Sequence, residues 1–214
     1  HLAAYNRKAG GYLHVYEDEW VRLATVPEIT DYLSLAFRIL QHVGLPAGGV
    51  TSPWDTGIHN EAVYAESIGR AYYRVFRRKF AWYFLHCIET SQPRWPWVSW
   101  SDKHSGLTVV SVPALTPDPF WNTISSPTKT IARNRAMQGV DRLITRDGRQ
   151  GRLRELFDGG YPLILLTHWQ SLYSEGKGGG LAGLKELLVR IERIFGSLVE
   201  WKTFSELAKT AKWE

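Results

Sequence analysis

The sequence predicts an α/β protein with mainly parallel strands. Short apolar runs such as residues 163–166 follow glycine or proline and stop at polar residues, which is typical of strands buried on both faces. Segments with apolar residues at helical spacing lie between these runs. Strands and helices therefore alternate along the chain, a pattern that favours a parallel sheet covered by helices.

Two helices and several short strands are expected in the first half of the chain. Thr25 and Glu28 form a capping box that opens the first helix, and Gly44 ends it in the left-handed position. Asn60 is expected to cap the second helix. In order, we expect a short strand over 12–16, a helix over 28–43, a strand over 49–52, a helix over 61–78, and strands over 80–87 and 108–113.

The tryptophan-rich stretch over residues 92–100 contains Pro96, so we interpret it as a loop and not as a central strand. Its indoles, Trp97 among them, could stack on a sugar or close one end of the fold. In the second half, we expect a loop over 116–129, a helix over 130–143, a turn over 145–148, a short helix over 151–157, a strand over 163–167, a flexible glycine hinge over 175–180, a helix over 181–195, a strand over 198–203 and a short helix from Ser205.

Composition bounds the class of protein. The chain has 214 residues, 44% hydrophobic and 22% charged, and no apolar run approaches the length of a membrane helix, so we expect a globular chain that does not cross a membrane. We find no linker and expect one domain over residues 1–214. The single Cys87 excludes an intrachain disulfide and cysteine-cluster zinc sites. The net charge of +5 is scattered, which makes nucleic acid an improbable partner but is compatible with an anionic glycan. Ten Trp and ten Tyr suit a glycan or small carbohydrate as the partner.

The best site candidate follows the expected strand over residues 163–167. Ligands of parallel α/β folds bind at the carboxyl ends of strands, and this strand stops at His168-Trp169-Gln170-Ser171. We expect His168 in catalysis and Trp169, Gln170 and Ser171 as substrate contacts. The alternative is a structural histidine that bonds a neighbouring loop.

Two catalytic arrangements are open. In one, His14, His86 and His168 converge on a divalent metal such as zinc, with Asp55 or Glu61 as a fourth ligand or as the base. In the other, His168 is a general acid or base and Asp55 or Glu61 is its carboxylate partner. Paired carboxylates could also serve a glycoside hydrolase.

Three segments resemble the polysaccharide deacetylase-like superfamily, the nodulation-type deacetylases, in the carboxyl-terminal half of that family's domain. They are the helix over 28–43 that leads through Gly44 to the strand ending at Pro53-Trp54, the aliphatic run ending at His168, and the segment 199–203 followed by Ser205. The resemblance implies a partial or distorted (β/α) barrel, a catalytic-acid role for His168, and an acetate pocket shaped by Pro53 and by Trp54 as a substrate contact.

The chain departs from that family at several positions. Thr51 stands where the family has arginine, no His-x3-His pair is present, and the family's paired Asp residues would lie upstream of His1. Two explanations are open: the amino-terminal part of the family domain precedes residue 1, or the site has been lost or rebuilt in this chain. We expect a carbohydrate-active hydrolase that removes acyl groups from an amino-sugar glycan; the alternatives are an inactive glycan-binding protein on a decayed deacetylase fold and a glycoside hydrolase.

Overall fold

The chain folds into two compact units. The computed structural model describes residues 4–6, 10–13, 16–52, 55–85 and 93–211. Unit 1 comprises residues 1–88, 95–113 and 202–214, and unit 2 comprises residues 89–94 and 114–201. The sequence predicts a single domain. The chain passes from one unit to the other and back, so no one linker lies between them.

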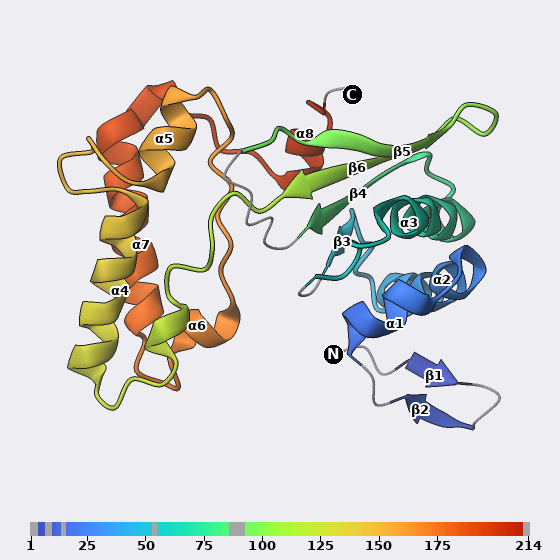
Figure 1. The fold of residues 1–214 in the computed structure, drawn as a ribbon, viewed down its shortest axis with the longest axis horizontal. Coiled ribbons are helices and arrows are strands. Elements are labelled where there is room, and N and C mark those ends of the chain that lie inside the picture. Colours follow the sequence, from blue (N-terminus) through green and yellow to red (C-terminus); the bar gives the residue numbers. More distant parts are fainter. Residues whose placement is uncertain (1–3, 7–9, 14–15, 53–54, 86–92, 212–214) are drawn as a thin grey trace. The chain divides into compact units, whose positions relative to one another are not determined.

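Unit 1 is built on a four-stranded sheet with the strand order β3-β4-β6-β5 (Figure 1). Strands β3, β4 and β6 are parallel, and β5 pairs with β6 in the antiparallel sense. A separate antiparallel pair, β1 and β2, precedes the helices. The elements are β1 (Ala4–Asn6), β2 (Gly11–Leu13), α1 (Glu17–Leu23), α2 (Val26–His42), β3 (Val50–Thr51), α3 (Glu61–Phe76), β4 (Phe80–Leu85), β5 (Trp97–Asp102), β6 (Leu107–Pro113) and α8 (Phe204–Ala208).

The predicted α/β class and the mainly parallel strands are confirmed. Among the described residues the sheet is open, so the partial or distorted barrel stays a prediction. The expected strands over 49–52, 80–87 and 108–113 correspond to β3, β4 and β6.

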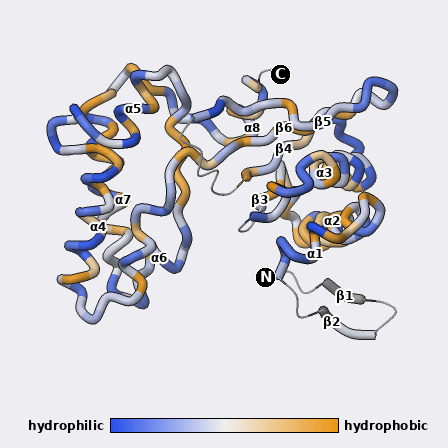
Figure 2. Tube along the Cα trace, in the orientation of Figure 1, coloured by the Kyte–Doolittle hydropathy of each residue, from blue (hydrophilic) through white to orange (hydrophobic). Residues whose placement is uncertain are grey.

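Helix α2 forms as its end signals predict. The backbone N–H and the hydroxyl of Thr25 both donate to the Glu28 carboxylate, at 2.9 and 2.7 Å. At the other end Gly44 has φ +78°, and the Leu45 N–H donates to the Leu40 carbonyl at 2.8 Å. This pattern is a Schellman ending. Hydrophobic and hydrophilic residues alternate along the helix (Figure 2), and its buried side includes Ile29, Leu33 and Phe37.

Helix α3 begins where it was predicted, but Asn60 does not cap it. The Asn60 side-chain amide donates instead to the Val21 carbonyl at 2.6 Å, which joins α3 to the end of α1. The buried face of α3 places Tyr64, Ile68 and Tyr72 in the core of unit 1.

The prediction of a loop over residues 92–100 is wrong for its second part, because β5 covers Trp97–Asp102. Pro96 lies directly before the strand, and β5 is at the edge of the sheet. A proline directly before an edge strand is tolerated, since no ladder hydrogen bond is lost there.

Unit 2 is mainly helical. Its elements are the short 3-10 helix η1 (Trp121–Thr123), α4 (Lys129–Leu143), α5 (Arg152–Asp158), α6 (Trp169–Tyr173), α7 (Gly179–Phe195) and η2 (Gly196–Leu198). Helices α4 and α7 run side by side in the same direction (Figure 1), since Gly179 lies against Ala132, Gly183 against Ala136, and Arg190 against Asp141.

The predicted flexible hinge over residues 175–180 is wrong for its last two residues. Gly179 and Gly180 are the first turn of α7, and both are buried. A Cβ at Gly179 would come within 2.7 Å of the Ala132 backbone, and one at Gly180 would overlap the backbone of Ser171. These glycines are therefore required for the close approach of backbones rather than for flexibility.

Two predicted strands of the second half do not form. Residues 161–168 have no regular secondary structure and belong to no sheet, and the alternation of buried Ile164 and Leu166 with half-buried neighbours contradicts burial on both faces. Residues 196–198 form η2, and residues 199–203 have no regular structure. An apolar run indicates that a segment is buried, but a strand also needs a neighbouring backbone with which to form hydrogen bonds.

Candidate functional site

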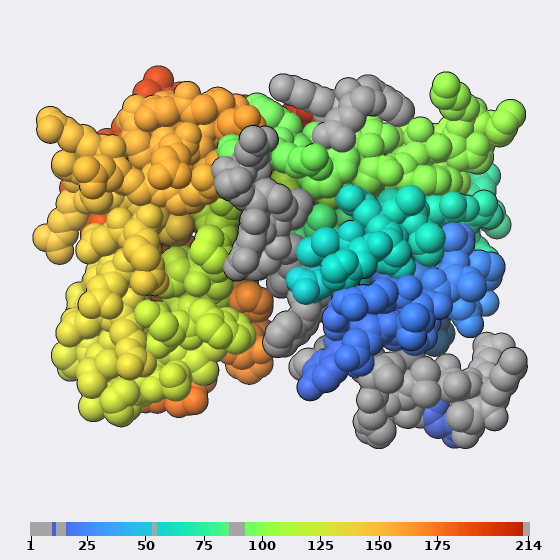
Figure 3. Space-filling model, viewed as in Figure 1, coloured from blue at the N-terminus to red at the C-terminus, as the bar shows by residue number. Residues whose placement is uncertain are grey.

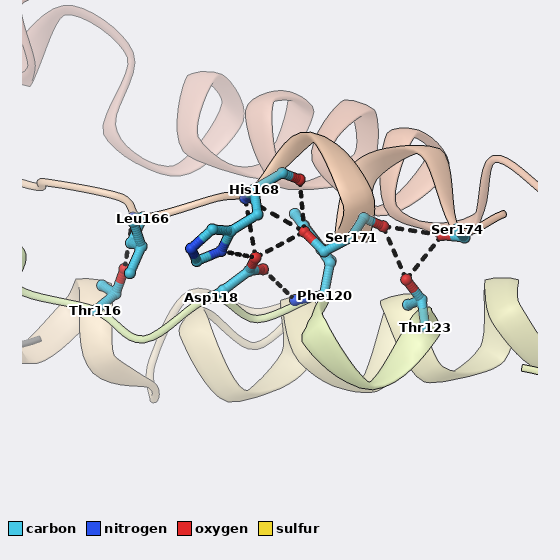
Figure 4. A network of polar contacts seen from close by, with 8 residues as sticks. All are labelled: Thr116, Asp118, Phe120, Thr123, Leu166, His168, Ser171 and Ser174. Atoms are coloured by element: carbon cyan, nitrogen blue, oxygen red, sulfur yellow. Dashed lines mark hydrogen bonds and ion pairs between the residues drawn. The ribbon is translucent and has the colours of Figure 1, made fainter. Parts of the chain in front are cut away.

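The irregular segment that leads to His168 is held by a second irregular segment of unit 2, residues 114–118. The Leu166 N–H donates to the Thr116 hydroxyl, which in turn donates to the Ile164 carbonyl, each at 3.4 Å. One buried side chain thus takes the place of a sheet ladder. Asp118 follows two residues later, and its side chain points at His168 (Figure 4).

The Asp118 carboxylate is the centre of the site. Its Oδ2 accepts from the His168 backbone N–H at 3.0 Å and from the Ser171 hydroxyl at 2.6 Å, and it lies 2.8 Å from His168 Nδ1. Its Oδ1 accepts from the Phe120 N–H at 2.8 Å. The Asp118 side chain is only 4% exposed, so these contacts compensate a buried charge.

The carboxylate determines how the imidazole is arranged. A carboxylate only accepts hydrogen bonds, so the proton of a neutral His168 ring lies on Nδ1, and Nε2 is the proton-accepting nitrogen. The side chain is 31% exposed, and the ring meets Trp121 edge-on with 4.9 Å between the ring centroids. The result is an oriented imidazole with access to solvent.

Ser171 takes part in this network as a structural residue. Its side chain is buried, and its single hydroxyl proton is within hydrogen-bond reach of the Asp118 carboxylate at 2.6 Å and of the His168 carbonyl at 2.8 Å. Behind it, the Thr123 hydroxyl donates to the Ser171 carbonyl at 2.8 Å and lies 2.7 Å from the Ser174 hydroxyl. The predicted role of Ser171 as a substrate contact does not fit this burial, because its oxygen is engaged inside the protein.

One exposed aromatic side chain, Trp121, contacts the imidazole, and two more follow His168 in α6. Trp169, directly after His168, is 72% exposed, Trp121 is 52% exposed and Tyr173 is 58% exposed. Gln170 is exposed as well. Indole faces open to solvent are the groups on which sugar rings stack. The predicted contacts Trp169 and Gln170 are thus placed beside His168.

The predicted carboxylates belong to unit 1. The Tyr83 hydroxyl donates to Glu61 Oε1, and Asp55 lies in the loop that follows β3 with its side chain exposed. Burial, with the nearby negative charge of Glu61, raises the pKa of Tyr83 far above its ordinary value. His168 belongs to unit 2, so a partnership of His168 with Asp55 or Glu61 stays a prediction.

The other predicted residues divide into two groups. Trp97 is 5% exposed and packs in the core of unit 1, so the predicted sugar contact is replaced by the alternative, a core indole. His14, His86 and Trp54 lie outside the described residues. Within the described ranges no three His, Cys, Asp or Glu side chains are grouped as metal ligands. The zinc site of His14, His86 and His168 therefore stays a prediction.

Sequence reasoning missed Asp118, the residue that orients His168. It lies fifty residues earlier in the chain, in a segment predicted only as a loop. One signal was available: Asp118 stands between Pro117 and Pro119, which restrict the backbone on both sides. A carboxylate fixed in this way in a loop is a candidate for a defined contact.

Comparisons with family models, with curated proteins and with solved structures found no match to this chain. The resemblance to polysaccharide deacetylases accordingly stays a prediction. In the part of the chain that the structure describes, no helix is long and apolar enough to span a membrane.

Proposed function

We propose that the chain is a carbohydrate-active hydrolase in which His168 transfers a proton to or from a glycan held on the neighbouring indoles. The observation that carries the proposal is the pairing of His168 Nδ1 with the buried Asp118 carboxylate, 2.8 Å away, beside the exposed rings of Trp121 and Trp169. An imidazole oriented by a carboxylate is a recurrent general acid–base arrangement.

The reaction class follows from the resemblance and from the direction of the imidazole. With Nδ1–H bonded to Asp118, Nε2 is the nitrogen that takes up a proton to form the imidazolium and then delivers that proton to a leaving amine, which returns the ring to its neutral form. Removal of an acyl group from an amino sugar needs such an acid. The attacking water requires a second group, for which Asp55 or Glu61 is the predicted candidate. In the other predicted arrangement, with zinc on His14, His86 and His168, the His168 ring would hold the metal and would not be the acid. The same resemblance predicts that the open sheet is part of a distorted (β/α) barrel.

A second candidate is glycan binding without catalysis. The observation in its favour is that Asp118 accepts four hydrogen bonds, among them two backbone N–H groups from separate segments. Those contacts give Asp118 and His168 a sufficient structural role in joining the two segments. The exposed indoles would then bind the sugar by themselves.

Acetate release from fully acetylated chitohexaose, measured with and without added zinc, tests the first candidate. If the proposal is right, the wild type releases acetate and His168→Gln does not. The matched control is His104→Gln, an exposed histidine of unit 1, which should keep wild-type activity.

Calorimetric binding of the same oligosaccharide separates the two candidates. Trp169→Ala should weaken binding, whereas Trp201→Ala, which removes an indole that is 62% exposed elsewhere in unit 2, should not. Binding without acetate release supports the glycan-binding protein. The absence of both oligosaccharide binding and acetate release would contradict both candidates.

A further inference from the structure

A cluster of arginines marks a second site, at the end of unit 2 that lies away from His168. The pocket is formed by the loop over residues 145–150, by α5 and by the last turn of α7, and has a volume of about 630 Å³. In Figure 1 this loop projects beside α5, and in Figure 3 its amber side chains stand out from the surface. The lining residues are Arg146, Asp147, Gly148, Arg149, Arg154, Arg193 and Ile194.

The loop is held in one shape by its own hydrogen bonds. The Thr145 N–H donates to the Gln150 carbonyl at 3.0 Å, and the Gly148 N–H donates to the Thr145 carbonyl at 3.0 Å. Asp147 Oδ1 accepts from the Thr145 hydroxyl at 2.6 Å and from the Arg149 N–H at 3.2 Å. Gly148 has φ +72° and lies against Ile194 of α7. The two arginines of the loop therefore start from a fixed backbone.

The two remaining arginines are placed by other elements. Arg154 of α5 is held by Asp158 through hydrogen bonds of 2.9 and 2.5 Å. Arg193 of α7 donates to the Arg146 carbonyl, which fixes its guanidinium against the loop. Three separate elements thus direct guanidinium groups to one pocket.

The charge of the pocket is strongly unbalanced. Four guanidinium groups line it, and Asp158 neutralises that of Arg154, which leaves three guanidinium groups against the carboxylate of Asp147. Within the described residues, Arg146, Arg149 and Arg193 make no ion pair, and all three are exposed. Like charges held near one another repel, and an anion between them removes that repulsion. The fold therefore maintains an arrangement that an anion would stabilise.

We propose that this pocket binds a compact anion that carries two or more phosphate groups. Guanidinium groups donate to phosphate oxygens in a two-pronged fashion, and the three that make no ion pair within the described residues exceed what one phosphate needs. Among the described residues no aromatic ring lines the pocket, so this lining lacks the stacking surface that single-stranded nucleic acids use.

The phosphate pocket is separate from the glycan site. His168 precedes α6, next to the first turn of α7, whereas Arg193 lies in the last turn of α7. A helix of 17 residues spans about 25 Å at 1.5 Å per residue. The two proposals therefore rest on different residues and can fail independently.

Calorimetric titration with inorganic tripolyphosphate at low salt tests the proposal. We expect binding that Arg149→Gln and Arg193→Gln each weaken by about tenfold, that Arg149→Lys weakens less, and that added salt weakens further. The matched control is Arg133→Gln, which removes the same charge from an exposed position of α4 and should bind like the wild type. Melting curves of all variants check that the fold is kept, and Trp169→Ala should leave tripolyphosphate binding unchanged.

Three results would overturn the proposal. One is the absence of tripolyphosphate binding. Another is an equal loss in Arg133→Gln and Arg149→Gln, which would indicate attraction by net charge alone. The third is tighter binding of a duplex DNA oligonucleotide than of tripolyphosphate through the same arginines, which would assign the pocket to nucleic acid.

Discussion

The two units reach a packed core by opposite means. In unit 1 large rings fill the space between α2, α3 and the sheet: Phe37 contacts Tyr72 and Phe76, and Tyr64 contacts Tyr83. In unit 2 the centre of the α4–α7 contact is made of glycine and alanine, so that the two helix backbones come close together. Unit 1 is therefore sensitive to the removal of atoms, and unit 2 to their addition.

The largest expected effect is the removal of a ring from unit 1. Phe37 is 3% exposed, and Phe37→Ala leaves a cavity among Tyr72 and Phe76. We expect a loss of about 4 kcal/mol in the free energy of unfolding, measured by urea denaturation. Leu35→Ala on the same helix, where the side chain is 54% exposed, should cost less than about 0.5 kcal/mol. Equal losses of stability in the two variants would contradict the claim that the core of unit 1 depends on its buried rings.

The converse change in unit 2 is the addition of one methyl group. Gly180→Ala should destabilise the protein by about 3 kcal/mol, because the Cβ would overlap the backbone of Ser171 and Leu172. Alanine is the better helix former by about 1 kcal/mol, so propensity alone predicts the opposite sign. Val189→Ala, at a 54% exposed position of α7, is the control. A more stable Gly180→Ala variant would show that the close approach is not needed.

The ring-filled core also predicts that unit 1 is sensitive to alkali. Burial raises the pKa of Tyr64 to about 12, although the hydrogen bond with Ser52 partly offsets this, and the pKa of Tyr83 is raised further. A raised folded pKa means that stability is complete below the unfolded value near 10 and is lost as pH increases from there towards 12.

We expect a loss on the order of 2 kcal/mol from Tyr64 at the top of that range, measured by urea denaturation at increasing pH. Tyr64→Phe should lower the free energy of unfolding at neutral pH by about 1 kcal/mol, because the buried Ser52 hydroxyl loses its hydrogen-bond partner. It should also show a smaller decrease between pH 10 and 12. An unchanged pH dependence in this variant would contradict the assignment.

The smallest expected effects should be equal in the two units, because helix caps act locally. Thr203 accepts from the Glu206 N–H in unit 1, and Thr128 accepts from the Ile131 N–H in unit 2. Each Thr→Ala change should cost about 1 kcal/mol, and each Thr→Ser change should cost less because the hydroxyl is kept. A clear inequality between the two alanine variants would show that the units differ in more than their cores.

Local signals in the sequence predicted the parts of the fold that depend on neighbouring residues. Thr25, Glu28 and Gly44 marked the two ends of α2 because a cap is formed within one turn of chain. The expected strand over residues 163–167 failed because a strand depends on a partner elsewhere, and here the partner is the side chain of Thr116. The glycines at the start of α7 were misjudged because close packing and flexibility require the same residue type.

The candidate site was predicted in one half only. His168, Trp169 and Gln170 are adjacent in the sequence, and an apolar run ending in a histidine was enough to select them. Asp118 completes the site through hydrogen bonds across fifty residues, and no periodicity or spacing connects it to His168. Long-range pairs of this kind need coordinates or a second sequence to be found.

The position of α8 has a consequence for biosynthesis. Residues 202–211 complete unit 1, where Phe204 packs against Trp82 and Phe84, and the Trp82 indole donates to Ser205 at 3.0 Å. Unit 2 takes nearly all of its residues from the uninterrupted stretch 114–201. On the ribosome, the stretch 114–201 is translated before residues 202–211, so the contacts of α8 with β4 form only after the main part of unit 2 has been made.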